Sequence, residues 1–217
     1  MGILKKTRLE KFAGYFFVLY YLVGLVGLIL PFTRDMFISL MPLTLLLSTA
    51  ILLFFHGRWR STDAIVLLFI ALTGYLIEVL GVLTGHVFGI YWYGNALGFQ
   101  LFNTPLIIGL NWMMLAYCVF AIMESAKLFW PLKALTAAIL MVAYDFVMEP
   151  VAMQLDMWDW AGGVVPMQNY QAWFIISLVF LSAMHLAKVK TNNRVAPWLF
   201  GVQFAFFVAL NVLLRVS

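Results

Sequence analysis

Seven stretches of about 20 predominantly apolar residues follow one another along this chain of 217 residues. A helix of roughly 20 residues spans a hydrocarbon core about 30 Å thick, so each stretch is long enough to cross a bilayer. Only 10% of the residues are charged, which is too little to cover a water-soluble globule. We therefore expect an all-α, polytopic membrane protein, a bundle of about seven transmembrane helices in a single domain over residues 1–217. The predicted spans are residues 12–32, 36–55, 63–84, 104–123, 131–150, 170–188 and 196–215.

Basic residues are distributed unevenly over the connections between these spans. If the N-terminus is cytoplasmic, 11 of the 13 lysines and arginines lie on the cytoplasmic side. This asymmetry follows the positive-inside rule, so we predict a multi-pass protein of the cell membrane with its N-terminus inside and its C-terminus outside. The net charge of +4 then reflects orientation in the membrane and not a nucleic-acid partner. The inner residues are Lys5, Lys6, Arg8, Lys11, Arg58, Arg60, Lys127, Lys133, Lys188, Lys190 and Arg194, which leaves Arg34 and Arg215 outside.

Carboxylic acids interrupt two of the predicted spans. Glu78 in the third span and Asp145 in the fifth each lie roughly 8 to 9 Å below the outer end of the helix, at about 1.5 Å per residue. Asn111 and Asn211 fall at a similar depth, so four helices each place a polar side chain in one layer. Glu149 follows Asp145 by one turn on the same helix face, but nearer to the interface, where it either belongs to the site or is simply solvated.

No lysine or arginine is expected at this depth to neutralise the acids. An ionisable group in hydrocarbon is costly, roughly 2.5 to 3.5 kcal/mol for Asp at mid-membrane, and such groups usually face an interior cavity and have a function. Alternatively, the acids only hydrogen-bond Asn111, Asn211 or a tyrosine and hold the helices together. On the functional interpretation, the catalytic candidates are Glu78, Asp145, Glu149 and Asn111.

The outer connection at residues 85–103 contains no Lys, Arg, Asp or Glu, but it is rich in aromatic residues and glycine. Such a segment can fold back over the bundle as a lid and bring its aromatic side chains near the acids. The other long outer connection, at about residues 151–169, adds Trp158 and Trp160. Alternatively, these side chains form the aromatic belt that most membrane proteins have at the interface.

The sequence lacks the residues that are typical of several classes of membrane protein. His56 and His185 are expected on the cytoplasmic side and His86 on the outer side, so they cannot form the histidine cluster of a di-iron oxygenase. The seventh span has no lysine for a retinal Schiff base, and no glycine-rich nucleotide motif precedes a helix. We therefore expect neither a metal nor another cofactor.

Four motifs, in this order, are similar to those of a known family. They are EVLGVLTGHVFGIYWYGNALG at 78–98, NTPLIIGLNWMMLAY at 103–117, YDFVMEPVAMQLDMWDW at 144–160 and VPMQNYQAWF at 165–174. Together they resemble the membrane-integral carotenoid hydratases over roughly residues 60–190. The resemblance implies that water is added to the acyclic end of a carotenoid such as γ-carotene, lycopene or bisanhydrobacterioruberin. It also implies a carotenoid substrate, a lipid bilayer around the protein, and other carotenoid-pathway enzymes as candidate partners.

Acid catalysis suits this reaction. Hydration of the terminal C1=C2 double bond needs a proton donor at C2 and a water molecule directed at the tertiary cation that forms at C1. A buried carboxylic acid supplies the proton, a second carboxylate or an Asn orients the water, and aromatic faces stabilise the cation. On this chemistry, the expected substrate-binding residues are Tyr91, Trp92, Tyr93, Trp112, Tyr144, Trp158, Trp160, Asn169 and Asn211.

Two other functions use the same residues. In a small proton-coupled transporter the acids would relay protons, but the cytoplasmic halves of the spans are mostly apolar and offer no polar route. A non-catalytic assembly factor for carotenoid enzymes would bind pigment and would lose nothing when the acids are removed.

Overall fold

The computed structural model describes residues 3–214, with side chains from residue 7 onward. Within this range, eight α-helices make up most of the chain and four short strands lie in the connections. Six of the helices are long and apolar enough to cross a membrane, which confirms the predicted all-α, multi-pass architecture. The elements are α1 (Ile3–Ile29), α2 (Pro31–Ser39), α3 (Met41–Phe54), α4 (Ser61–Thr84), β1 (Tyr91–Tyr93), β2 (Gln100–Leu101), β3 (Thr104–Pro105), α5 (Ile107–Glu124), α6 (Trp130–Gln154), β4 (Trp158–Trp160), α7 (Met167–Leu186) and α8 (Ala196–Leu213).

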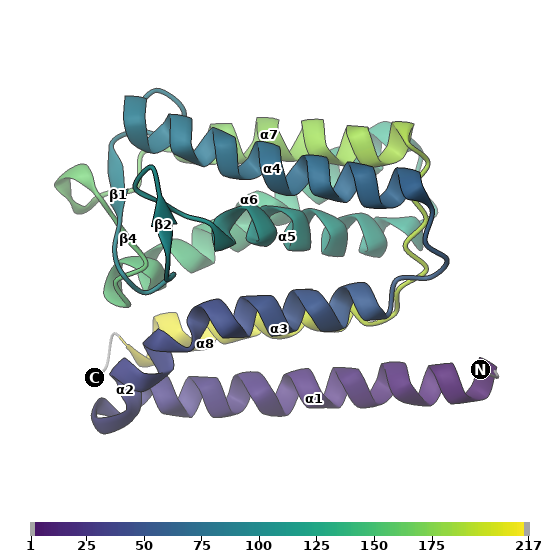
Figure 1. The fold of residues 1–217 in the computed structure, drawn as a ribbon, viewed down its shortest axis with the longest axis horizontal. Helices are drawn as coiled ribbons and strands as arrows, with labels where there is room; N and C mark the ends of the chain where they lie inside the picture. Colours follow the sequence, from purple (N-terminus) through teal and green to yellow (C-terminus); the bar gives the residue numbers. More distant parts are fainter. Residues whose placement is uncertain (1–2, 215–217) are drawn as a thin grey trace.

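The long helices lie side by side, and their ends gather at two opposite ends of the molecule (Figure 1). α1, α3 and α8 form one group and α4, α6 and α7 the other, while α5 contacts helices of both groups. In the membrane-spanning part of α5, 83% of the residues are buried. Its sequence is apolar on nearly all sides, which suits a helix at the centre of the bundle.

The N-terminus lies at the same end of the bundle as the α3–α4 and α7–α8 connections (Figure 1). A hydrogen bond from the α7–α8 connection to Glu124 shows that α5 also ends there. We call this the basic end, because the start of α1 and the connections at this end together carry most of the lysines and arginines, whereas Arg34 on α2 lies at the opposite end. The arrangement agrees with the predicted topology, but Arg215 and the side chains of Lys5 and Lys6 lie outside the described residues. Which end faces the cytoplasm stays a prediction.

The predicted span at residues 36–55 is broken in two. α2 and α3 meet at Leu40, and their axes are bent by 55°. Pro42 has no N–H to donate to the Ile38 carbonyl and its ring would clash there, so a continuous helix is disfavoured at this point. The second predicted span is therefore a bent pair of helices, and the bundle has seven crossings if this pair counts as one span and six if it does not.

The two long outer connections fold together into a cap over one end of the bundle (Figure 1). β1 pairs antiparallel with β4, with Tyr91 opposite Trp160 and Tyr93 opposite Trp158. β2 and β3 form a hairpin before α5, so that helix starts at Ile107 and not at the predicted residue 104. The segment predicted to fold back as a lid is thus held in place by strand pairing with the other connection.

Candidate functional site

Three carboxylic acids meet beneath the cap. Glu78 comes from α4, whereas Asp145 and Glu149 come from α6, one turn apart on the same face. Each is at most 5% exposed. They line a cavity of about 20 Å³, roughly the space of one water molecule.

Glu78 is held by three neutral donors. The Tyr91 and Tyr93 hydroxyls donate to Oε2 at 2.6 and 2.8 Å, and Nε1 of Trp112 donates to Oε1 at 2.8 Å. Burial, and next the Glu78 carboxylate, raise the pKa of both tyrosine hydroxyls, so they stay protonated and can donate. Alternate side chains of a strand share a face, which is why Trp92 points the other way and is 51% exposed.

Glu149 is buried, so of the two alternatives for this residue, simple solvation at the interface does not apply. α6 continues through Pro150 as far as Gln154, and β4 packs against this helix. Nε1 of Trp158 and Nε1 of Trp160 donate to Oε2 of Glu149 at 2.8 and 2.7 Å. Each paired strand of the cap therefore supplies two donors to one acid, β1 to Glu78 and β4 to Glu149.

Asp145 has the fewest partners of the three acids. Nδ2 of Asn169, on α7, donates to its Oδ2 at 2.6 Å and also reaches Oε1 of Glu149 at 3.3 Å. Oδ1 of Asp145 is buried and has no hydrogen-bond partner among the described residues. Buried polar atoms are usually paired. An unpaired carboxyl oxygen beside a water-sized cavity is therefore a group that can bind water or carry a reactive proton.

Neutral groups surround the acid cluster. Within the described part of the chain, no lysine, arginine or histidine side chain hydrogen-bonds or pairs with these acids. The described part of the chain also contains no group of three or more His, Cys, Asp or Glu side chains arranged to hold a metal ion. Trp112 stacks on Trp173 with ring centroids 4.0 Å apart, and Trp173 also lines the cavity. Hydroxyl, indole and amide donors, and not cations, thus hold the acids in place.

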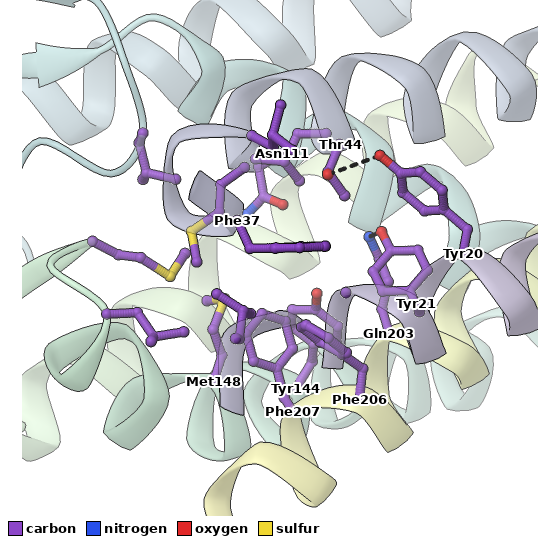
Figure 2. A pocket seen from close by; sticks show the side chains of 18 of the residues that line it. Tyr20, Tyr21, Phe37, Thr44, Asn111, Tyr144, Met148, Gln203, Phe206 and Phe207 are labelled. Carbon is purple, nitrogen blue, oxygen red and sulfur yellow. Dashed lines mark hydrogen bonds between the residues drawn. The ribbon is translucent and has the colours of Figure 1, made fainter. Parts of the chain in front are cut away.

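A second, larger cavity of about 340 Å³ lies between helices of both groups (Figure 2). Its lining is mostly apolar and includes Val23 and Leu40, which are exposed at the surface of the bundle. Ile108, Met148 and Trp158 line both cavities. The acid cavity and the larger apolar cavity therefore share a wall.

A few polar groups also line the larger cavity (Figure 2). The Tyr20 hydroxyl lies 3.0 Å from the Thr44 hydroxyl, and Nε2 of Gln203 donates to the Tyr21 hydroxyl at 2.7 Å. Asn111 lines this cavity too, and its amide has no hydrogen-bond partner among the described residues. Asn111 thus lies on the other side of the shared wall from the acids.

The other predicted binding residues are divided among different places. Tyr144 lines the larger cavity, while Trp112 and Asn169 bind the acids. Asn211 donates to the carbonyls of Val147 at 2.5 Å and Phe207 at 2.9 Å, so it ties α8 to α6 and lines neither cavity.

Sequence reasoning missed several residues that line the two cavities. Tyr20 and Tyr21 on α1 and Gln203 on α8 were not selected, although a tyrosine pair and a glutamine inside apolar spans mark helix faces that need polar partners. Trp173 lies within the VPMQNYQAWF motif, but nothing in the sequence indicates that it stacks on Trp112.

A comparison with known protein families adds an independent finding. The model of a family described as "Carotenoid biosynthesis protein" matches residues 40–216. The chain belongs to this family. Membership places the protein in the carotenoid pathway, and no curated protein and no solved structure is found to match the chain.

The region shared with the carotenoid biosynthesis family contains both strands of the cap, all three acids and Asn111. The match begins at the junction of α2 and α3, so the part of the larger cavity that α1 supplies lies outside the matched residues.

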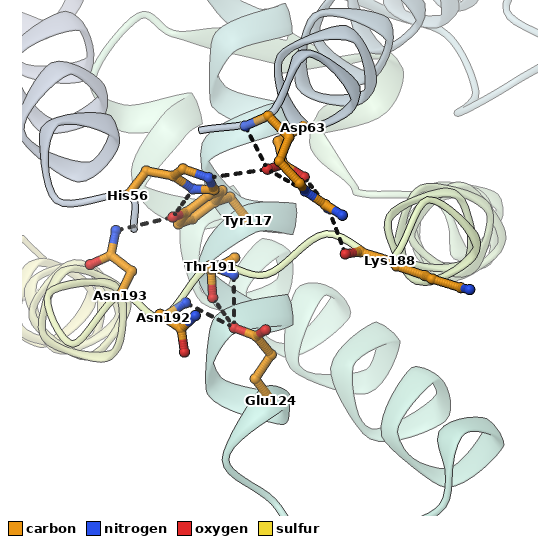
Figure 3. A network of polar contacts seen from close by, with 9 residues as sticks. His56, Asp63, Tyr117, Glu124, Lys188, Thr191, Asn192 and Asn193 are labelled. Carbon is orange, nitrogen blue, oxygen red and sulfur yellow. Dashed lines mark hydrogen bonds and ion pairs between the residues drawn. The ribbon is translucent and has the colours of Figure 1, made fainter. Parts of the chain in front are cut away.

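This member of the carotenoid biosynthesis family has another polar network at the basic end (Figure 3). Asp63, near the start of α4, accepts hydrogen bonds from the backbone N–H and from Nε of Arg60, both at 3.1 Å, and from Nη2. Nη2 of Arg60 also donates to the Lys188 carbonyl at 2.6 Å. Arg60 therefore ties the start of α4 to the end of α7.

His56 and Glu124 extend this network. Nδ1 of His56 lies 2.8 Å from the Tyr117 hydroxyl, and Nε2 lies 3.6 Å from Oδ2 of Asp63. Burial lowers the pKa of His56, and this effect outweighs the opposing influence of Asp63. Glu124 accepts a hydrogen bond from the Thr191 backbone N–H at 3.0 Å, and another from the Thr191 hydroxyl. The network thus links α3, α4, α5 and the α7–α8 connection.

Proposed function

We propose that this protein is a cofactor-independent carotenoid hydratase of the cell membrane. It adds water across the terminal C1=C2 double bond of an acyclic carotenoid end group and gives a tertiary alcohol. The wall shared by the two cavities carries the proposal, because a water-sized space lined by acids lies directly behind an apolar space lined by Val23 and Leu40, which are exposed at the surface of the bundle. The reaction needs an acid and a water molecule beside an apolar alkene, and these two cavities supply both.

The larger cavity suits the end of a carotenoid and not the whole molecule. At about 340 Å³ it is near the lower limit of ligand pockets, which run from roughly 300 to 1,000 Å³. The long polyene therefore remains outside, beyond the exposed Val23 and Leu40. Met148 in the shared wall has an unbranched, flexible side chain, so an end group can displace it and approach Asp145.

Asp145 is the proposed proton donor, because Oδ1 is the one carboxyl oxygen known to be buried without a partner in the cluster. The protonated acid transfers its proton to C2, and the π electrons of the double bond form the new C2–H bond. C1 becomes a tertiary cation and Asp145 becomes a carboxylate. Nearby indole and phenol rings stabilise the cation, by about 2 kcal/mol where water is excluded.

Water completes the reaction at C1. Its oxygen forms the new C1–O bond, and the proton that it releases returns to Asp145, so the acid is regenerated in each cycle. Glu78 and Glu149 hold fixed positions through their cap donors and orient the water. The reaction thus adds one water molecule to the carotenoid and removes one double bond from it.

Expression in cells that make lycopene or γ-carotene tests this function. We expect a product heavier by one water, formed under strict anaerobiosis and with a chelator present, with its new oxygen taken from isotopically labelled water. Incorporation of labelled molecular oxygen would indicate an oxygenase and contradict the proposal. Pigment that co-purifies unchanged, with no hydrated product from any acyclic carotenoid supplied, would indicate binding without catalysis, as in an assembly factor.

A further inference from the structure

A third cavity, of about 380 Å³, opens at the basic end between the end of α5, the start of α6 and the end of α7. Lys133, Lys188 and Lys190 line it, and none of them forms an ion pair within the described part of the chain. We propose that this cavity binds the phosphate headgroup of an anionic phospholipid. The site lies at the opposite end of the bundle from the acid cluster and does not depend on the proposed reaction.

The charge of the cavity favours an anion. Glu124 is the only carboxylate among its described lining residues, and it already accepts hydrogen bonds from the backbone N–H groups of Thr191 and Asn192. Trp130 and Lys133, in the first turn of α6, also line the cavity. The N–H groups of Leu132 and Lys133 already donate to the Phe129 carbonyl, but the positive end of the helix dipole still adds to the attraction for phosphate.

The walls of the cavity are fixed before any lipid binds. Lys188 has a left-handed backbone conformation with φ of 53°, which is uncommon for a lysine, and Arg60 holds its carbonyl. Its side chain points away from the network around Asp63 (Figure 3). On the other wall, the His185 ring stacks on Trp130 with ring centroids 3.8 Å apart. The backbone of Lys188 and the stacked rings thus fix the shape of the cavity, while the exposed side chains of Lys188 and Lys190 bring their charges to it.

Apolar surface around the cavity favours a lipid over a soluble phosphate. Phe120 and Met123 line its inner part. Leu128, Phe129 and Leu186 are exposed beside it, as expected for side chains in contact with acyl chains. A lipid phosphate reaches the lysines while its acyl chains cover this surface, and basic pockets at the ends of membrane helices are known to bind anionic headgroups.

Binding can be measured on the purified full-length protein after delipidation, with phosphatidylglycerol and phosphatidylcholine as probes. We expect phosphatidylglycerol to be retained in native mass spectrometry and to raise the thermal midpoint, and phosphatidylcholine to do neither. The triple variant Lys133→Gln, Lys188→Gln, Lys190→Gln should lose about a hundredfold in apparent affinity, since each lysine near a membrane surface contributes roughly a factor of five.

A matched variant distinguishes lipid binding in this cavity from general electrostatic attraction of the lipid to the basic end. Lys11→Gln, Lys127→Gln, Arg194→Gln removes three charges from the same end but none from the cavity, and it should keep its affinity within about twofold. The triple lysine-to-arginine variant of the cavity should also bind and shows whether the fold tolerates change there. Equal loss in both glutamine triples would overturn the proposal. Inorganic phosphate or pyrophosphate that stabilises the protein when phosphatidylglycerol does not would also overturn it, in favour of a soluble ligand.

Discussion

The acids beneath the cap and the acids at the basic end are held in opposite ways. Both oxygens of Asp63 receive hydrogen bonds from Arg60, and Glu124 accepts backbone N–H groups. Asp145 has one amide donor and one unpaired oxygen, and it lies beside a cavity. Neither Asp63 nor Asp145 is accessible to solvent, so solvent exposure alone does not distinguish them.

The hydrogen-bond partners of each carboxyl group, and the space beside it, distinguish the two acids. A carboxylate that is paired with a guanidinium and surrounded by side chains and backbone joins helices, and nothing is left for it to react with. A carboxyl group with a free oxygen next to a water-sized cavity is available for proton transfer. We therefore assign a structural role to the network at the basic end and a chemical role to the acid cluster.

Asp145→Asn should give the largest effect. The amide keeps the size of the side chain and can still pair with Asn169, but it cannot donate a proton, so turnover should fall about a hundredfold to ten-thousandfold. The measurement is product formed per folded, membrane-inserted molecule. Asp159→Asn is the matched control, since Asp159 is exposed on β4 and accepts only from the Trp160 backbone N–H. Near-normal turnover in Asp145→Asn would end the proposed mechanism.

Glu78→Gln should be the next most severe change. A glutamine can keep the Trp112 hydrogen bond through its oxygen, but its NH₂ group then faces the Tyr91 and Tyr93 hydroxyls, which lose their charged acceptor and must accept instead of donate. Loss of one hydrogen bond to a charged group corresponds to roughly a tenfold to hundredfold fall in turnover. Glu149→Gln should behave alike, because Glu149 is as buried as Glu78 and has the same kind of donors. A normal rate in both variants would show that these acids only position the cap.

Asp63→Asn, at the basic end, should lower the stability of the protein and leave its turnover almost unchanged. It removes the ion pair with Arg60 and weakens the capping box at the start of α4, so the thermal midpoint should fall by about 2 to 5 °C. Turnover per folded molecule should stay within about twofold of normal. A midpoint that does not change, combined with a large loss of turnover, would break the comparison between the two regions.

Acidification should have the smallest effect, through His56. Its pKa in the folded protein lies below the ordinary value of 6.5, so the unfolded chain takes up a proton at higher pH than the folded one. Stability should therefore be complete above about pH 7 and fall as the pH drops through 6.5 toward the lower, folded pKa. Thermal midpoints at pH 7.5 and 5.5 measure this, and His56→Gln should reduce the difference between them. An equal difference in the variant would assign the effect to other groups.

The depth of a polar residue in the membrane could be predicted from the sequence, but the direction in which its side chain points around the helix axis could not. Counting residues from the helix ends placed Glu78 and Asp145 in one layer, and they do meet. Asn111 lies on α5, which is apolar and buried on nearly all sides, so no polar face indicates which way its side chain points. Asn111 consequently lines the larger cavity and not the one that contains the acids.

The pairing of the cap strands also could not be predicted from the sequence. Strands of two or three residues have too few positions to show an alternating pattern, and the partners are far apart in the chain. Without β4 folded over the end of α6, Glu149 looks like an interfacial acid. The side chains that hydrogen-bond the acids were nevertheless all among the predicted catalytic or binding residues, although the sequence equally allowed the aromatic ones to form an interfacial belt.

The pairing of β1 with β4 also determines when the site comes into existence during biosynthesis. β1 leaves the ribosome soon after α4, but β4 follows only after α5 and α6 have been made. Until then Glu149 has no indole donors, and the two strands have nothing to pair with. A partly synthesised or wrongly inserted chain therefore carries the acids without an enclosed pocket. Strand pairing is thus possible only in molecules whose central helices have already been made, and α7, which supplies Asn169 and Trp173, completes the pocket after it.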